Sequence, residues 1–107
     1  MLRNLLDETI GDLAEQGKTV EDVKFVLLTP FLKCSMVDFC YVAKDIDYDA
    51  GYGCAEINNI MIIGDNWWME RAEYDGSEWW EFKTAPNEPE DVIKSPSNIK
   101  HFICGGQ

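Results

Sequence analysis

The sequence has few basic residues, a single histidine and no long apolar run, and each shortage excludes a class of protein. No apolar run approaches the roughly 18 residues that a membrane-spanning helix needs. Asp7, Glu8 and Asp12 interrupt the N-terminal segment, which therefore lacks the apolar centre of a secretory signal. We therefore expect a soluble protein of the cytoplasm.

The four cysteines are not spaced as metal ligands. Cys34, Cys40, Cys54 and Cys104 form no C-x-x-C pair, and His101 is the only histidine. A structural zinc site needs paired ligands a few residues apart, so this spacing does not predict zinc. Without a secretory signal the thiols are expected to stay reduced. We expect them to be buried or half-buried as small apolar groups rather than to form a Cys–His nucleophile.

The charge balance is strongly acidic. Nine Lys and Arg stand against twenty Asp and Glu, which gives a net charge of −11 and an isoelectric point near 4.3. The negative electrostatic field of such a chain repels phosphate groups. It therefore excludes binding to nucleic acid or to anionic membranes through general electrostatic attraction. Because 46% of the 107 residues are hydrophobic, there is enough apolar material for one core. We expect a single domain over residues 1–107, with an N-terminal helix (1–16), an α+β core (19–84) and a tail (85–107).

The first half of the chain shows helix and strand patterns in turn. Leucine and isoleucine recur at helical spacing over residues 1–16, which predicts an amphipathic helix. Residues 23–28 are β-branched and aromatic, which favours a strand. Ser35 is placed to cap a second helix over residues 35–44, and residues 45–53, rich in Asp, Gly and Tyr, are expected to form a loop.

The second half predicts an antiparallel meander. Strand-like runs over residues 57–63, 67–74 and 78–84 are separated by short turns that contain Gly, Asp and Asn. The tail, 85–107, contains three prolines and is expected to wrap the surface, ending in an edge strand over residues 99–103. The expected class is α+β: a small antiparallel sheet, made of the meander plus one or two further strands, with two helices packed on one face.

Two pairs of adjacent tryptophans, Trp67-Trp68 and Trp79-Trp80, mark the last two predicted strands. Successive side chains of a strand point to opposite faces, so each pair places one indole on each side of the sheet. The helices can cover only one side. The other indoles either pack across the hairpin or under the tail, or they form a recognition patch, since Trp, Tyr and Arg anchor interfaces and stack on bases.

The register of this hairpin is open between two alternatives. A two-residue turn at 75–76 places Glu70 opposite Glu81, a like-charge pair that is destabilising. A three-residue loop that begins one residue earlier avoids this pair and places Arg71 opposite Trp79, which allows a cation–π contact. We expect the second register. The candidate residues for binding a ligand or partner are Trp67, Trp68, Trp79, Trp80, Arg71, Glu73, Tyr74, Glu81, Tyr48 and Tyr52.

An acidic segment has the ligand spacing of a calcium-binding loop. Asp45, Asp47 and Asp49 occupy positions one, three and five of a twelve-residue window that ends in Glu56, as in an EF-hand. The sixth position departs from that motif, because Ala50 stands where a glycine makes the sharp turn. The four carboxylates are therefore a candidate Ca²⁺ or Mg²⁺ site, and the alternative is a solvated acidic turn whose Asp side chains cap backbone groups.

One part of the sequence resembles a known family. The stretch GDNWWMER (64–71), followed by EYDGSEWWEFK (73–83), is similar to the signature block of a family of small uncharacterised proteins from phages and prophages, and DYDAGYG (47–53) and residues 19–25 are also similar to parts of it. Ala72 departs from the pattern, which has a larger residue there. The resemblance implies a mobile-element accessory protein in the cytoplasm of an infected bacterium. It transfers no catalytic residue.

Three functions follow as hypotheses, in this order. The first is a binding inhibitor, in which the acidic surface occupies the nucleic-acid-binding surface of a basic host defence protein, as an anti-CRISPR protein would. The second is a sponge that sequesters a nucleotide immune messenger between aromatic rings, at the interface of a homodimer in one form of the hypothesis. The third is a metal-dependent hydrolase that uses the acidic loop. We expect a protein without catalytic activity.

Overall fold

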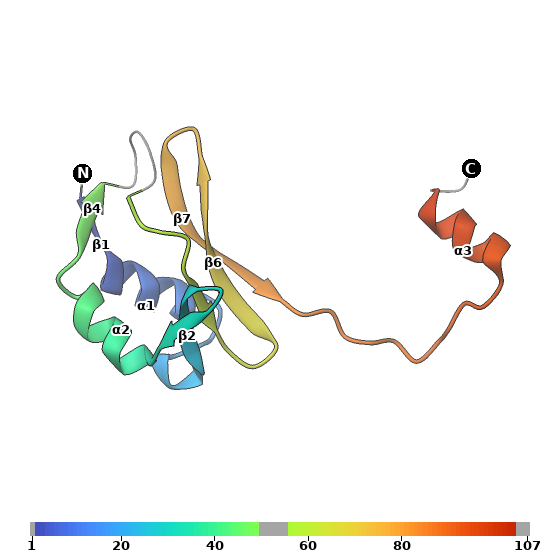
Figure 1. Cartoon of the computed structure of the whole chain (residues 1–107), viewed down its shortest axis with the longest axis horizontal. Coiled ribbons are helices and arrows are strands. Elements are labelled where there is room, and N and C mark those ends of the chain that lie inside the picture. Colours follow the sequence, from blue (N-terminus) through green and yellow to red (C-terminus); the bar gives the residue numbers. More distant parts are fainter. Residues whose placement is uncertain (1, 50–55, 105–107) are drawn as a thin grey trace.

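The computed structural model describes residues 2–49 and 56–104 of the chain (Figure 1). Within these ranges the chain forms three α-helices, a five-stranded antiparallel sheet and a two-stranded sheet. The predicted α+β class is therefore confirmed. None of the helices in the described ranges is long and apolar enough to cross a membrane.

The main sheet has the strand order β3-β2-β5-β6-β7, and all of its neighbours are antiparallel. Its strands are β2 (Phe25–Thr29), β3 (Leu32–Cys34), β5 (Met61–Ile63), β6 (Trp67–Tyr74) and β7 (Ser77–Thr84). The strand predicted over 57–63 begins only at Met61. Residues 57–60 stay irregular because the backbone amide of Ile57 donates to the Glu78 carboxylate instead of to a sheet neighbour.

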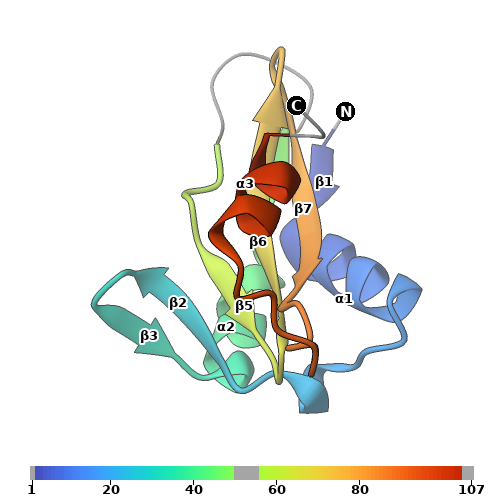
Figure 2. The same cartoon turned by 90° about the vertical axis from the view of Figure 1, so that its right-hand side faces the viewer.

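Helices α1 (Leu5–Glu15) and α2 (Met36–Ala43) cover one face of this sheet (Figures 1 and 2). Each begins at a side-chain cap: Asn4 Oδ1 accepts from the amide of Asp7, and Ser35 Oγ accepts from the amide of Asp38, both at 3.0 Å. A short 3₁₀ turn, Val20–Asp22, leads from α1 into β2. The core between helices and sheet consists of Leu5, Leu13, Val26, Met36, Phe39, Ala43, Tyr48, Ile62, Trp67, Met69 and Trp80.

A second, small sheet was not predicted. Strand β1 (Leu2–Asn4) pairs antiparallel with β4 (Asp47–Asp49), and Arg3 lies opposite Tyr48. The predicted N-terminal helix therefore starts at Leu5 rather than at residue 1, and part of the segment predicted as a loop is a strand. Each strand has only three residues, which is too short for the alternation of polar and apolar side chains to be recognised in the sequence.

The β6–β7 hairpin has the register that we did not expect. Tyr74 pairs with Ser77 across a two-residue turn at Asp75 and Gly76, whose φ angles are 51° and 87°. Two successive positive φ values define a type I′ turn, whose twist matches that of the flanking strands. Glu70 therefore lies opposite Glu81. The turn geometry outweighs this repulsion, and a lysine relieves it, as described below.

The C-terminal segment also differs from the prediction. Residues 85–95 leave the end of β7 without helix or strand and run away from the sheet, and residues 96–103 form helix α3 (Pro96–Ile103) rather than an edge strand (Figure 1). Ser95 and Pro96, at the N-cap and first helical position, are typical of a helix start. We refer to residues 85–104 as the arm. The expected wrapping of the surface by the tail is wrong for the arm.

Two glycines give opposite predictions for stability. A Cβ at Gly64 would overlap the indole of Trp67, which is buried in the core, whereas a Cβ at Gly11, on the exposed side of α1, would meet nothing within 4 Å. We expect Gly64→Ala to lower the free energy of unfolding by about 1–3 kcal/mol through overpacking. Gly11→Ala should raise it by about 0.5–1 kcal/mol, because alanine favours helix. Urea unfolding followed by tryptophan fluorescence measures both, and equal effects would contradict the packing at Gly64.

Candidate functional site

The two tryptophan pairs are divided between the faces of the sheet, as the sequence predicted. Trp67 and Trp80 point inward and are 4% and 5% exposed. Trp67 stacks on Phe82 with ring centroids 5.4 Å apart, and the Trp80 Nε1 donates to Thr9 Oγ1 on α1 at 2.9 Å. Trp68 and Trp79 occupy the alternate positions and are only half-buried. Trp67 and Trp80 are therefore core residues and are not available for contact with a partner.

The alternate positions form what we call the outer face, on the side of the sheet opposite to α1 and α2. The pairings place Phe25, Ile63, Trp68 and Lys83 in one row across four strands, and Leu27, Met61, Glu70 and Glu81 in the next row, with Trp79 opposite Ala72 beyond them. Its large apolar side chains are half-buried, and the arm leads away from it (Figure 1). This face thus combines partly exposed indoles with carboxylates.

Lys83 holds the two carboxylates of the outer face together. Its Nζ lies 2.6 Å from Glu70 Oε1 and 3.4 Å from Glu81 Oε1. The hydrogen bond from Lys83 lowers the pKa of Glu70 below its usual value, and Trp68 Nε1 also donates to this carboxylate at 3.2 Å. The lysine therefore compensates the like-charge pair that the two-residue turn creates, and it fixes an acidic group beside an indole.

Arg71 lies on the inward side of β6 in a buried ion cluster. Its side chain is 5% exposed, its NH1 lies 3.5 Å from Glu8 Oε1, and its NH2 lies 3.0 Å from Glu78 Oε1. The side chains of Glu8 and Glu78 are 5% and 2% exposed. The guanidinium carbon also lies 4.8 Å from the centroid of the Trp80 ring. The cation–π contact is thus to Trp80 and not to Trp79 as expected.

Tyr48 completes this cluster from the small sheet. Its hydroxyl donates to Glu8 Oε1 and accepts from Arg71 NH2, the latter at 2.9 Å. Burial and the hydrogen bond to Glu8 raise the pKa of Tyr48 to about 12, so the phenol stays protonated at neutral pH. The position of Tyr48 opposite Arg3 in the β1–β4 pair holds it there, which the sequence did not indicate.

The Arg71 cluster joins four parts of the chain. Glu8 comes from α1, Tyr48 from β4 and Glu78 from β7, and Glu78 also accepts from the backbone amides of Glu56 and Ile57 at 2.7 and 3.2 Å. Two carboxylates and a phenol contact NH1 and NH2 of the guanidinium, whereas its buried Nε has no hydrogen-bond partner in the described residues. The two carboxylates compensate the positive charge of Arg71. In the sponge hypothesis Arg71 would bind phosphate together with Lys83 and backbone amides of the Gly-rich loop. The arrangement of the cluster favours a structural role for Arg71 instead.

A polar hollow of about 370 Å³ lies beside the cluster. Asn58, Asn59, Ala72 and Glu73 contribute to its lining together with Arg71 and Glu78. Glu73 is exposed, as is Tyr74 near the hairpin tip. A carboxylate and two side-chain amides can accept hydrogen bonds from a lysine or arginine side chain of a partner. Tyr52, the remaining candidate, lies outside the described residues.

The acidic segment does not assemble as a calcium-type cluster in the described residues. Asp45 pairs with Lys44 at 3.1 Å, Asp47 accepts from Asn4 at 2.9 Å, and Glu56 accepts from the amide of Asp49 at 2.7 Å. Within 2–49 and 56–104, no three His, Cys, Asp or Glu side chains are grouped so that they could hold a metal ion. The carboxylates of Asp45, Asp47 and Glu56 are held by separate partners and do not converge on one point. Ala50, at the sixth position of the window, lies outside the described residues.

The described thiols differ in exposure. Cys34 and Cys40 are half-buried, and burial raises the pKa of both thiols, so both stay protonated at neutral pH. Cys104 is exposed at the end of α3. Cys54 lies outside the described residues.

Two arginines that share Glu8 give a matched test of the buried cluster. Arg71→Met leaves the buried Glu78 without its cation and removes one of the two cations of Glu8, so it should lower the free energy of unfolding by about 3–5 kcal/mol. Arg3→Met removes a pair to Glu8 whose arginine side chain is 50% exposed and should cost about 0–1 kcal/mol. Denaturant unfolding of both variants measures this, and similar losses would contradict the buried cluster.

The raised pKa of Tyr48 predicts a pH dependence of stability. A group whose folded-state pKa lies above its unfolded value stabilises the protein below the unfolded pKa, and this contribution disappears as the pH rises through the folded pKa. We expect the stability difference between the wild type and Tyr48→Phe, about 1–3 kcal/mol at neutral pH, to shrink between pH values of about 10 and 12. Unfolding curves at several alkaline pH values measure it, and a constant difference would refute the buried phenol.

Comparisons of the chain with protein-family models, with curated proteins and with solved structures gave no match. The resemblance to phage and prophage proteins therefore stays a prediction, and the function is argued below from the geometry of the chain itself.

Proposed function

We propose that the chain acts by binding, as an acidic inhibitor that occupies the nucleic-acid-binding surface of a basic host defence protein. The observation that carries this proposal is the outer face, where the partly exposed Trp68 and Trp79 lie on the same side of the sheet as Glu70 and Glu81. Indoles supply hot-spot contacts in protein interfaces, and carboxylates around them select a positively charged partner.

The distribution of charge supports a basic partner. The net charge is −11, and exposed carboxylates extend the acidic surface from the outer face to the hairpin tip, where Glu73 and Asp75 lie. An acidic surface accelerates the capture of a basic protein by long-range steering. A groove that binds nucleic acid has the complementary positive potential, because its lysines and arginines neutralise phosphates.

The inhibitor would prevent nucleic acid from binding because it occupies the same basic groove of the partner. Carboxylates of the outer face and the hairpin tip take the places of phosphates along the partner's groove, and the polar hollow beside Glu73 accepts a lysine or arginine side chain. The indoles bury apolar area that phosphates do not offer, and this makes the inhibitor selective for one protein. The action takes place in the cytoplasm of an infected bacterium, in agreement with the family resemblance.

A variant on each side of the protein tests the proposal. The probes are purified bacterial defence nucleases, beginning with CRISPR effector complexes, and the readouts are the dissociation constant and the competition with DNA. Trp79→Ala should weaken binding at least about 30-fold, as for an interface hot spot. Tyr41→Ala should leave binding unchanged, because this 71% exposed tyrosine lies on α2, on the other side of the sheet.

Salt dependence and folding complete the experiment. Affinity should fall as ionic strength rises, because the attraction is between exposed charges. Melting curves establish that Trp79→Ala is folded. Failure to bind any of the nucleases, simultaneous binding of inhibitor and DNA, or an affinity that is independent of salt would each overturn the proposal.

A further inference from the structure

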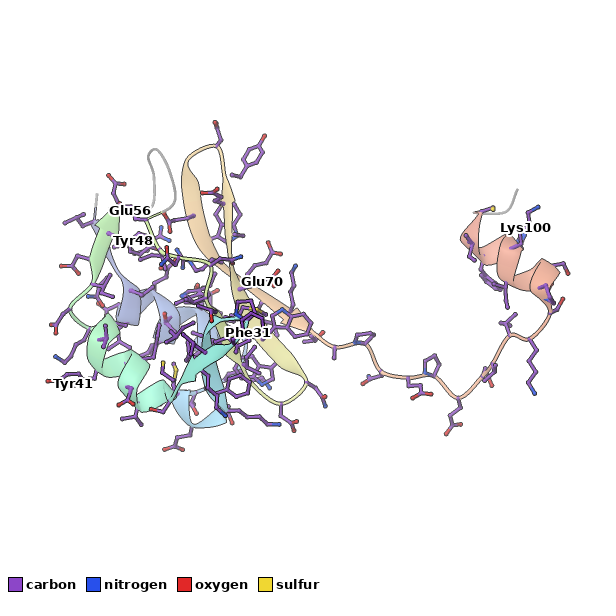
Figure 3. The ribbon with its side chains drawn as sticks, viewed as in Figure 1. Phe31, Tyr41, Tyr48, Glu56, Glu70 and Lys100 are labelled. Carbon is purple, nitrogen blue, oxygen red and sulfur yellow. The ribbon has the colours of Figure 1, made fainter. Side chains whose placement is uncertain are left out.

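Helix α3 carries an apolar stripe that is not buried by any part of the chain within residues 2–49 and 56–104. Ile99, Phe102 and Ile103 follow the i, i+3, i+4 spacing of a helix face, and Phe102 and Ile103 are 71% and 78% exposed. No described side chain of α3 is buried. Figure 3 shows these side chains away from the body of the protein, with Lys100 on the same helix.

The arm makes the chain much longer than a compact domain of this size. The radius of gyration is 18.2 Å, and the longest dimension is 56 Å. A compact chain of this length has a radius of gyration of about 13 Å. An isolated helix of eight residues is not stable in water, since helices shorter than about 12 residues depend on tertiary packing. Helix α3 therefore requires a surface on which to bury its apolar stripe.

The body offers an apolar groove between α2 and the segment 56–60, which we call the α2 groove. Its volume is about 480 Å³, in the range of about 300–1,000 Å³ that is usual for binding pockets. Most of its lining is apolar and comes from Leu5, Leu28, Cys34, Phe39, Val42, Ala43, Ile46, Ile57 and Ile60. A groove of this composition suits the anchors of an amphipathic helix.

The charges of the helix and the groove are complementary. The charged residues that line the α2 groove are Asp38 and Glu56, both acidic. Residues 92–104 contain Lys94 and Lys100 and no acidic residue. Lys100 follows Ile99 directly, so it lies at the border of the apolar stripe, where it can meet a carboxylate at the rim of a groove.

The geometry of the arm favours the groove of another molecule. Helix α2 and helix α3 lie at opposite ends of the long axis (Figure 1). The linker contains Pro86 and Pro89 together with three acidic residues, and such a segment is extended, at about 3.1 Å per residue. To reach its own groove the arm would have to reverse its direction and pass around the sheet.

We propose that two copies of this chain form a dimer by exchanging arms, with helix α3 of each copy bound in the α2 groove of the other. The exchange is reciprocal, so both apolar stripes and both grooves are covered and the assembly is closed. This inference is independent of the proposed function, because it uses α3 and the α2 groove and not the outer face of the sheet.

Sedimentation velocity of the full chain over about a hundredfold range of concentration tests the dimer. We expect a dimer that dissociates on dilution. Phe102→Asp should raise the dissociation constant at least about 30-fold. Tyr74→Asp, which changes a 77% exposed tyrosine near the hairpin tip, should leave it unchanged. Circular dichroism verifies that each variant is folded. We expect the core to be unaffected by Phe102→Asp, because helix α3 does not pack against the core of its own chain.

A charge exchange tests which surfaces meet. Lys100→Glu and Asp38→Lys should each raise the dissociation constant about threefold to tenfold, and the double variant should return it to within about threefold of the wild type. Recovery in the double variant is not expected if the two residues lie far apart in the dimer.

Three results would overturn the proposal. The first is a monomer at every concentration with a radius of gyration near 18 Å in small-angle X-ray scattering, which would mean that the arm binds no second copy. The second is a compact monomer of about 13 Å, in which α3 occupies its own groove. The third is a dimer that forms equally well with Phe102→Asp, which would use a different surface.

Discussion

The fold depends on one buried cation. Arg71 lies between Glu8 and Glu78 and under the hydroxyl of Tyr48, so that helix α1, strand β4 and the β6–β7 hairpin share a single set of charges. Burial of these groups is costly, and only the complete set repays it. Tyr48 is part of this set, and the pairing of the short strands β1 and β4 places its hydroxyl next to the guanidinium. The cluster also makes the inward side of the hairpin structural, while the outward side takes no part in it.

The sheet is covered on one side only, and this asymmetry determines what the protein can offer to a partner. Helices α1 and α2 lie on one side of the sheet (Figure 2), where Trp67 and Trp80 are buried. The alternation of the strands leaves Trp68 and Trp79 on the opposite side. The arm, which has enough length and apolar residues to cover that side, extends away from it instead (Figure 1). The outer face and helix α3 therefore both present apolar side chains, the first beside the carboxylates of Glu70 and Glu81 and the second beside Lys100.

Much of the fold could be predicted from local patterns. The helix that Ser35 caps, the meander and the division of the tryptophans between two faces follow from spacing that is visible in the sequence. The errors have local causes. The charge of Glu70 and Glu81 suggested a longer loop, but a type I′ turn at Asp75 and Gly76 fits the strand twist, and Lys83 bridges the two carboxylates. An edge strand was predicted over residues 99–103, whereas Pro96 begins a helix that extends through Ile103.

The sequence by itself determined the class of fold, the acidic net charge and the placement of one indole of each tryptophan pair on each side of the sheet, because each depends on composition or on the period of a single strand. Only the tertiary structure decided that Arg71 is a core residue, that Tyr48 joins it, and that Asp47 and Asp49 belong to a strand rather than to an ion-binding loop. Those roles depend on contacts between residues that are far apart in the sequence, such as Arg71 and Glu8, which are separated by 63 positions. No local pattern encodes such a contact, since it exists only when the chain has closed around the charge.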